Sequence, residues 1–346
     1  MSSLLIFISG AVLLIFSAEK LIGYLVGAAS GLKVSAFLLA IIFTGIEFDD
    51  IFLGVALNLE DLSSVALGTV FGTAISLTGV VLAVAAILTP VRVRIPSDYI
   101  ALLAAAPLVM IAFTLTAPLT VVDGVLLVGL FVQFVAYVAV RESKREIPVF
   151  RNQEVYAGMM ESDRVREFEV EEPGKSFAEE MPFAEARKLP GWAGLALALL
   201  ALVGLIIGAA TTGIGVEGIL EAWGIEGTLF GATIVTAVLT IEDIFLTVEP
   251  IRKGAPEIGV GNVIGSVVFS VTGKLGIIIL AGGAIVVGPD VLTWHLTALI
   301  VVTGLAAYFL YTERLQRWHG YVLLALYIAY WVISFVAFGG APIEMD

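Results

Sequence analysis

Three carboxylates, those of Glu47, Asp49 and Asp50, stand close together in the apolar sequence TGIEFDDIFL. A charge at the middle of a bilayer costs roughly 2.5–3.5 kcal/mol on insertion scales, so acids in such a segment indicate a function. The second half of the chain repeats the feature as TIEDIFL, with Glu242 and Asp243. We therefore expect two carboxylate-bearing helices to meet near the middle of a membrane and to hold a cation.

Helical geometry separates these acids into two groups. Positions three apart share a helix face, so we expect Glu47 with Asp50, and Thr240 with Asp243, to bind the cation. The carboxylates of this set, which are the expected metal ligands, are Glu47, Asp50 and Asp243. The residue before each aspartate is turned by about 100° and would line the site from the side. These two secondary residues are Asp49 and Glu242.

Two later stretches, GTVFGT from Gly68 and GNVIGS from Gly261, place small residues four apart, which permits close helix packing. They also supply hydroxyl and amide oxygens that would line the site. With one further serine these residues are Thr69, Thr73, Asn262, Ser266 and Ser270. Such oxygens suit hard cations such as Ca²⁺ and Mg²⁺. Softer metals need sulfur or imidazole, and the chain has no cysteine and only two histidines.

The composition predicts an integral membrane protein. Of the 346 residues, 59% are hydrophobic and 14% are charged, against about 25% charged in soluble domains. The net charge of −13 argues against a nucleic-acid partner. We expect membrane lipid and the transported inorganic cations as partners, and no cofactor beyond those cations. The sequence leaves the oligomeric state open.

The apolar runs have the length of membrane-spanning helices rather than of barrel strands. We therefore expect an all-α polytopic membrane protein with ten transmembrane helices. The first run lacks a basic n-region and a cleavage site, so we interpret it as a retained helix. The ten expected segments are 3–28, 34–58, 63–89, 98–116, 120–140, 193–212, 227–249, 256–282, 291–311 and 319–339.

A polar stretch, residues 141–190, divides the chain into two five-helix halves, 1–140 and 191–346. Lys and Arg gather in this acidic linker and in alternate loops, and the loops between those carry none. The positive-inside rule then places both termini outside and the linker in the cytoplasm. We expect the membrane to be the cell membrane. The basic residues of the alternate loops are Lys33, Arg92, Arg94, Arg252, Lys253, Arg314 and Arg317.

The two halves are repeats. Positions 50 and 243 differ by 193, and the same shift, without gaps, places Gly68 on Gly261 and Gly72 on Gly265. Each half has an odd number of expected spans, so the repeats must be inverted. Transporters built this way bind substrate near the midplane, where the repeats meet.

These residues resemble the α-repeats of the cation/Ca²⁺ antiporter superfamily, which includes the sodium/calcium exchangers. The family repeat has an acidic residue, then Gly-Asn eighteen residues later, then Gly-Ser-Asn four beyond that glycine. Asp50 leads to Gly68 and Asp243 leads to Gly261 at this spacing. The resemblance implies alternating access, with Ca²⁺ moving against Na⁺ or H⁺.

The chain also departs from the family pattern. The family has Glu, preceded by Pro, where this chain has aspartates preceded by acids. Twenty-seven residues after the acid, where the family has Asn or Asp, this chain has Leu77 and Ser270. Lys274 lies one turn after Ser270 and is expected to compensate part of the negative charge. Asp49 and Glu242 are alternative partners for this lysine or for Lys20.

We therefore expect a secondary active antiporter for a divalent cation, with Ca²⁺ as the first choice, and no enzymatic activity. Three alternatives stay open. One is an exchanger of the same fold for Mg²⁺ or a monovalent cation, and another is a channel. The third is an intramembrane aspartyl protease, since paired aspartates also suit acid–base chemistry.

Overall fold

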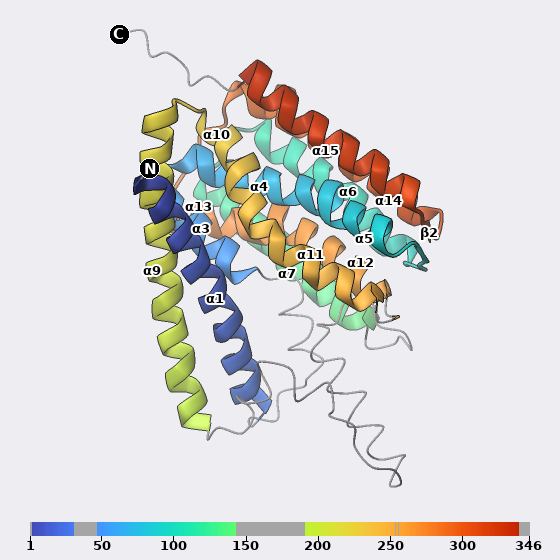
Figure 1. Ribbon diagram of the computed structural model, residues 1–346, viewed down its shortest axis with the longest axis horizontal. Helices are drawn as coiled ribbons and strands as arrows, with labels where there is room; N and C mark the ends of the chain where they lie inside the picture. The colour runs from blue at the N-terminus through green and yellow to red at the C-terminus, as the bar shows by residue number, and fades with distance from the viewer. Residues whose placement is uncertain (1, 31–46, 143–190, 253, 255, 339–346) are drawn as a thin grey trace.

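The computed structural model describes residues 2–30, 47–142, 191–252, 254 and 256–338, and these are mostly helical (Figure 1). Several helices join end to end through short π-helical turns, which are labelled η. The helical elements are α1 (Ser2–Ser30), α3 (Phe48–Leu59), α4 (Ser63–Ser76), η1 (Leu77–Val81), α5 (Leu82–Leu88), α6 (Ser97–Thr114), α7 (Val121–Glu142), α9 (Gly191–Trp223), α10 (Gly227–Phe230), η4 (Gly231–Val235), α11 (Thr236–Arg252), α12 (Pro256–Phe269), η5 (Ser270–Lys274), α13 (Leu275–Gly282), η6 (Val291–His295), α14 (Leu296–Tyr311) and α15 (Arg317–Phe338).

Within the described residues, nine helices are long and apolar enough to cross a membrane. They match nine of the ten expected segments. The remaining segment, 34–58, lies in large part outside the described residues, and its described part is α3. The expected linker, 141–190, also lies outside them from residue 143 onward. The nine spans are Ser2–Leu21, Ser63–Leu88, Ser97–Thr114, Val121–Arg141, Ala196–Trp223, Gly227–Arg252, Pro256–Gly282, Val291–Tyr311 and Arg317–Phe338.

Helices α1 and α9 lie side by side and form a pair at one edge of the molecule (Figure 1). Glycines make this close approach possible, because a Cβ on Gly208 would come within 2.6 Å of the Leu14 backbone nitrogen. The predicted segment 193–212 ended too early, since α9 continues to Trp223. The glycine-rich sequence near its end marks helix packing, not a helix terminus.

The centre of the larger helix group is formed by α4 and α12, whose residues are almost all buried. Figure 1 shows α4 and α5 running between α15 on one side and α11 on the other. Because these two helices are buried on all sides, their sequences are apolar throughout rather than amphipathic. The polar residues that they carry, among them Thr69, Thr73 and Ser266, are therefore inside the protein.

The two central helices share an irregularity. The π-helical turn η1 begins at Leu77 and η5 begins at Ser270, and these positions again differ by 193. A π turn inserts one extra residue into a helical turn and is frequent at functional sites. The sequence shift that relates the acidic motifs therefore also relates two local backbone distortions.

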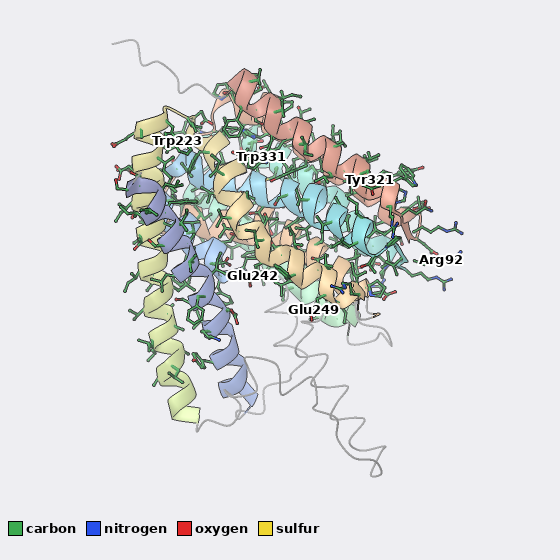
Figure 2. The ribbon with its side chains drawn as sticks, in the orientation of Figure 1. Arg92, Trp223, Glu242, Glu249, Tyr321 and Trp331 are labelled. Carbon is green, nitrogen blue, oxygen red and sulfur yellow. The ribbon has the colours of Figure 1, made fainter. Side chains whose placement is uncertain are left out.

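A two-stranded ribbon joins the loops that follow α5 and α14. Strand β1 (Val91–Arg92) pairs antiparallel with β2 (Arg314–Leu315), and Arg92 lies opposite Arg314. Figure 2 shows Arg92 extending away from this end of the helices. Two loops that the charge pattern assigned to the same side of the membrane thus lie together.

Gly72 is expected to be a position where a single methyl group destabilises the fold. An added Cβ would come within 2.6 Å of the Ala232 carbonyl oxygen and would also meet the Thr236 hydroxyl. Backbone cannot move aside as a flexible side chain can, so Gly72→Ala should lose about 1–3 kcal/mol through overpacking. Thermal unfolding of the purified protein in detergent measures this loss.

Gly129 provides the matched control, because nothing lies within 4 Å of a Cβ added there. Gly129→Ala in α7 should leave the melting temperature unchanged or raise it, since alanine favours helix by up to about 1 kcal/mol. Equal melting temperatures for the two variants would show that α4 does not pack against η4 as described.

Candidate cation site

The residues expected from the sequence come mainly from five elements. Asp50 lies in the first turn of α3, and Asp243 lies in the interior of α11. The two buried helices α4 and α12 add the hydroxyl and amide side chains, and η5 ends on Lys274. Because η5 packs against α3 and α4, the first-half and second-half residues meet.

Asp50 is held by two side chains, those of Thr73 and Lys274. Its Oδ2 accepts a hydrogen bond from the Thr73 hydroxyl at 2.9 Å and forms a close ion pair with the Lys274 ammonium. The same ammonium donates to Thr73 Oγ1 at 3.0 Å and to the Thr69 carbonyl oxygen at 3.3 Å. The Lys274 side chain is completely buried. The position of Asp50 in the first helical turn further stabilises its negative charge.

Glu47 does not lie on the helix that the spacing argument assumed. It is the N-cap residue of α3, with extended backbone at φ −84° and ψ 94°, so the shared face predicted for Glu47 and Asp50 is wrong in detail. Its carboxylate nevertheless turns inward. Both oxygens are buried, and neither has a hydrogen-bond partner in the described part of the protein. Asp243, Asp50 and Lys274 are its electrostatic neighbours.

Asp243 is also buried, with 8% of its surface exposed. Its charged neighbours are Asp50, Asp49 and Lys274, and among the described residues no hydrogen bond to its carboxylate is formed. The two aspartates related by the repeat are therefore unlike each other. Asp50 is paired with Lys274 and hydrogen-bonded to Thr73, whereas the described residues form no hydrogen bond to the Asp243 or Glu47 carboxylate.

The hydroxyl groups of the predicted set connect the two halves. Thr240 Oγ1 lies 2.8 Å from Ser76 Oγ, and Ser270 donates to the Val70 carbonyl oxygen at 3.1 Å. Asn262 donates a long hydrogen bond, 3.4 Å, to Thr247.

Ser266 is buried on α12 and lies near the Glu47 carboxylate, outside hydrogen-bonding geometry. The predicted oxygens are thus inside the protein, but several are already engaged with one another.

Asp49 and Glu242 form a second, more exposed acidic pair. Each is only partly buried, and each lies in the electrostatic range of the site aspartates. Glu242 has Asp49 and Glu19 of α1 among its neighbours, and Figure 2 shows it on α11 beside α1. The alternative pairing of these acids with lysine is wrong, because Lys274 pairs with Asp50 and Lys20 lies 3.8 Å from Glu19.

Two site residues were missed by the sequence interpretation. Ser76 contacts Thr240, and Thr247 contacts Asn262. Ser76 precedes Leu77, the position at which the family pattern has an amide or acid, so a search one residue to either side would have found it. Throughout the part that the structure describes, no three acidic or histidine side chains converge closely enough to hold a metal ion. The ammonium of Lys274 takes the position between Asp50 and Thr73 instead.

Taken together, the long apolar helices and the buried acids define a polytopic membrane protein with acidic side chains buried among its helices. The chain belongs to the sodium/calcium exchanger protein family, whose model matches residues 2–140 and 193–336. The resemblance inferred from the acidic motifs and their spacing is therefore confirmed.

Individual relatives agree with this membership. The sodium/calcium exchanger MaX1 of Methanosarcina acetivorans is 30% identical over 118 residues, which are 33% of this chain and 33% of that relative. The chain thus spans about a third of the length of MaX1. The putative antiporter CaxA of Alkalimonas amylolytica is 25% identical over 339 residues, covering 94% of this chain and 96% of CaxA.

Solved structures show the same fold. The sodium-calcium exchanger NCX_Mj, soaked with 100 mM Na⁺ and 10 mM Sr²⁺, superposes with a TM-score of 0.55. The alignment covers 97% of this chain and 98% of that chain at 19% identity. NCX_Mj soaked with 2.5 mM Na⁺ and 0.1 mM Ca²⁺ gives the same TM-score at 18% identity.

Proposed function

We propose that this protein is a secondary active antiporter that exchanges a divalent cation, Ca²⁺, for Na⁺ or H⁺ by alternating access. The observation that carries the proposal is the buried Glu47 carboxylate, whose two oxygens have no hydrogen-bond partner in the described part of the chain, with Asp243 as a charged neighbour. A buried acid without a hydrogen-bond partner is costly in a membrane protein, so we expect a cation to bind it. Membership of the sodium/calcium exchanger family supports Ca²⁺ as that cation.

The proposed ligands are Glu47, Asp50, Thr240 and Asp243. Ca²⁺ takes six to eight oxygens at flexible geometry, and the secondary residues around these four supply further oxygens. The secondary set is Asp49, Glu242, Thr69, Thr73, Asn262, Ser266 and Ser270. Support for this set comes from its position, since α3, α4 and α12 pack against η5 and α11 packs against α4 and α12.

We propose further that the fold has ten transmembrane helices in two inverted five-helix repeats, 1–140 and 191–346, joined by the linker 141–190. Support comes from the shared shift of 193 between acidic motifs and between π turns. A site between inverted repeats opens to opposite sides as one repeat rocks against the other. Carboxylates without a bound cation repel one another. Monovalent ions or protons would therefore replace the divalent ion when the carrier returns to the opposite side.

The proposed orientation has both termini outside and the linker in the cytoplasm of a cell. It rests on the positive-inside rule. The ribbon formed by β1 and β2 supports it, because it brings Arg92 and Arg314 from two separate loops to the same end of the helices.

Uptake of radioactive Ca²⁺ into vesicles that contain the purified protein tests the function. Uptake should follow an opposing Na⁺ or H⁺ gradient and should stop when that gradient is collapsed. Parallel assays with Mg²⁺ and with a monovalent cation test the alternatives for the cargo. Passive flux that ignores the gradient would identify a channel, and peptide cleavage without flux would identify a protease; either result would reject the antiporter.

A further inference from the structure

Lys274 places a positive charge where the Asp50 half of the proposed site would hold a cation. Its ammonium is in contact with a carboxylate, a hydroxyl and a backbone carbonyl, those of Asp50, Thr73 and Thr69. A lysine ammonium has three N–H donors, so these three oxygens use all of them. The same three kinds of oxygen are ligands for hard cations. The ammonium is therefore coordinated as a free cation would be.

The Asp243 half of the proposed site has no lysine that corresponds to Lys274. Lys274 is the last residue of η5, and the shift of 193 relates it to Val81, the last residue of η1, which is buried and apolar. Lys274 thus has no charged counterpart in the first repeat. On the other side, the two Glu47 oxygens have no hydrogen-bond partner in the part of the chain that the structure describes, and the charged neighbours of Asp243 are mostly acids.

Stability alone does not account for this lysine. Replacing a buried ion pair by well-packed apolar residues is often neutral or stabilising, so a buried pair is weak evidence for a structural role. A bilayer makes the insertion of both charges more costly still. An apolar residue such as the valine at position 81, together with an amide at position 50, would give a fold without either charge.

We propose that Lys274 is a tethered cation that holds Asp50 between loading events and that the carried cation binds by displacing its ammonium. The inference rests on the proposed function and names the regulation of that same site. Ca²⁺ first meets the free oxygens of Glu47 and Asp243, and Asp50 joins them as the ammonium leaves. After release of Ca²⁺ the ammonium returns to Asp50.

Two consequences follow from this competition. The unloaded carrier already has one positive charge at Asp50, so it needs one fewer free cation at this position on its return. Ca²⁺ binding is also weakened, since only molecules without the Lys274–Asp50 contact are competent. If that contact exists in about nine-tenths of the molecules, the apparent dissociation constant is raised about tenfold.

Lys274→Met tests the proposal, because methionine keeps much of the length of the side chain and removes the charge. In vesicles, the Ca²⁺ concentration for half-maximal uptake should fall about tenfold, and the maximal rate should fall as well because release becomes slower. Val81→Ala is the matched control at the corresponding position of the other repeat. It should change the half-maximal concentration by less than about twofold, since no charge is removed. Unchanged or weaker Ca²⁺ affinity in Lys274→Met would overturn the proposal.

A second measurement uses the wild-type protein and does not depend on whether the variant folds. A structure solved with Ca²⁺ bound should show the Lys274 ammonium away from Asp50. An ammonium that stays on Asp50 beside bound Ca²⁺ overturns this inference alone. A wild-type protein that binds no Ca²⁺ at all overturns the proposed function, and this inference with it.

Discussion

Replacing Asp243 by asparagine is expected to abolish cation exchange while leaving the fold intact. A unit charge about 4 Å from another contributes roughly 4 kcal/mol at the effective dielectric constant typical of proteins, and a divalent cation doubles that. Losing even about 3 kcal/mol reduces the affinity about 100-fold. Stability should not fall, because the Asp243 carboxylate has no hydrogen-bond donor in the described structure that asparagine would forfeit. Ca²⁺ uptake into vesicles and thermal unfolding measure the two effects.

Thr236→Ser is a suitable comparison for this variant. Thr236 is buried on the same helix and donates to the Gly231 carbonyl oxygen, a contact that serine preserves. Its uptake should stay close to that of the wild type. If Asp243→Asn retained full uptake, the carboxylate would not be a ligand, and the proposed site would have to be moved.

Much of the architecture could be predicted because bilayer insertion imposes a strong length and polarity pattern on each segment. The buried helices α4 and α12 were recognised from glycines at four-residue spacing, and Gly68 and Gly72 do pack against the segment formed by α10 and η4. The acids of the site were found because charge in an apolar run is costly. Their spacing relative to the glycines also identified the family, which the match over most of the chain confirms.

The features that could not be predicted are details of the backbone conformation and the choice of ion-pair partner. Glu47 was placed on a helix face because spacing alone cannot show that α3 begins at Phe48. The π turns η1 and η5 have no composition of their own, so nothing in the sequence marks them. Lys274 had several acids within reach, and only the fold decides that it pairs with Asp50.

Asp50→Asn should lower the stability of the protein, whereas Asp243→Asn should not, although the two aspartates correspond in the repeat. Removing one partner of a buried ion pair leaves the other charge uncompensated and typically loses about 3–5 kcal/mol. The Lys274 ammonium, which is completely buried, would keep only the Thr73 hydroxyl and the Thr69 carbonyl oxygen. We therefore expect a marked drop in melting temperature in detergent, together with loss of Ca²⁺ uptake.

The double variant Asp50→Asn with Lys274→Met separates these two effects. It removes both charges, so the melting temperature should recover most of what Asp50→Asn alone loses, and the coupling between the two positions should be about 1–3 kcal/mol. Ca²⁺ uptake should stay absent, because a proposed ligand is still missing. If stability recovers and uptake does not, the pair affects stability through charge compensation. Its effect on transport is then due to Asp50. An Asp50→Asn variant as stable as the wild type would show that the Lys274 ammonium is not left uncompensated, and the Lys274–Asp50 ion pair would be rejected.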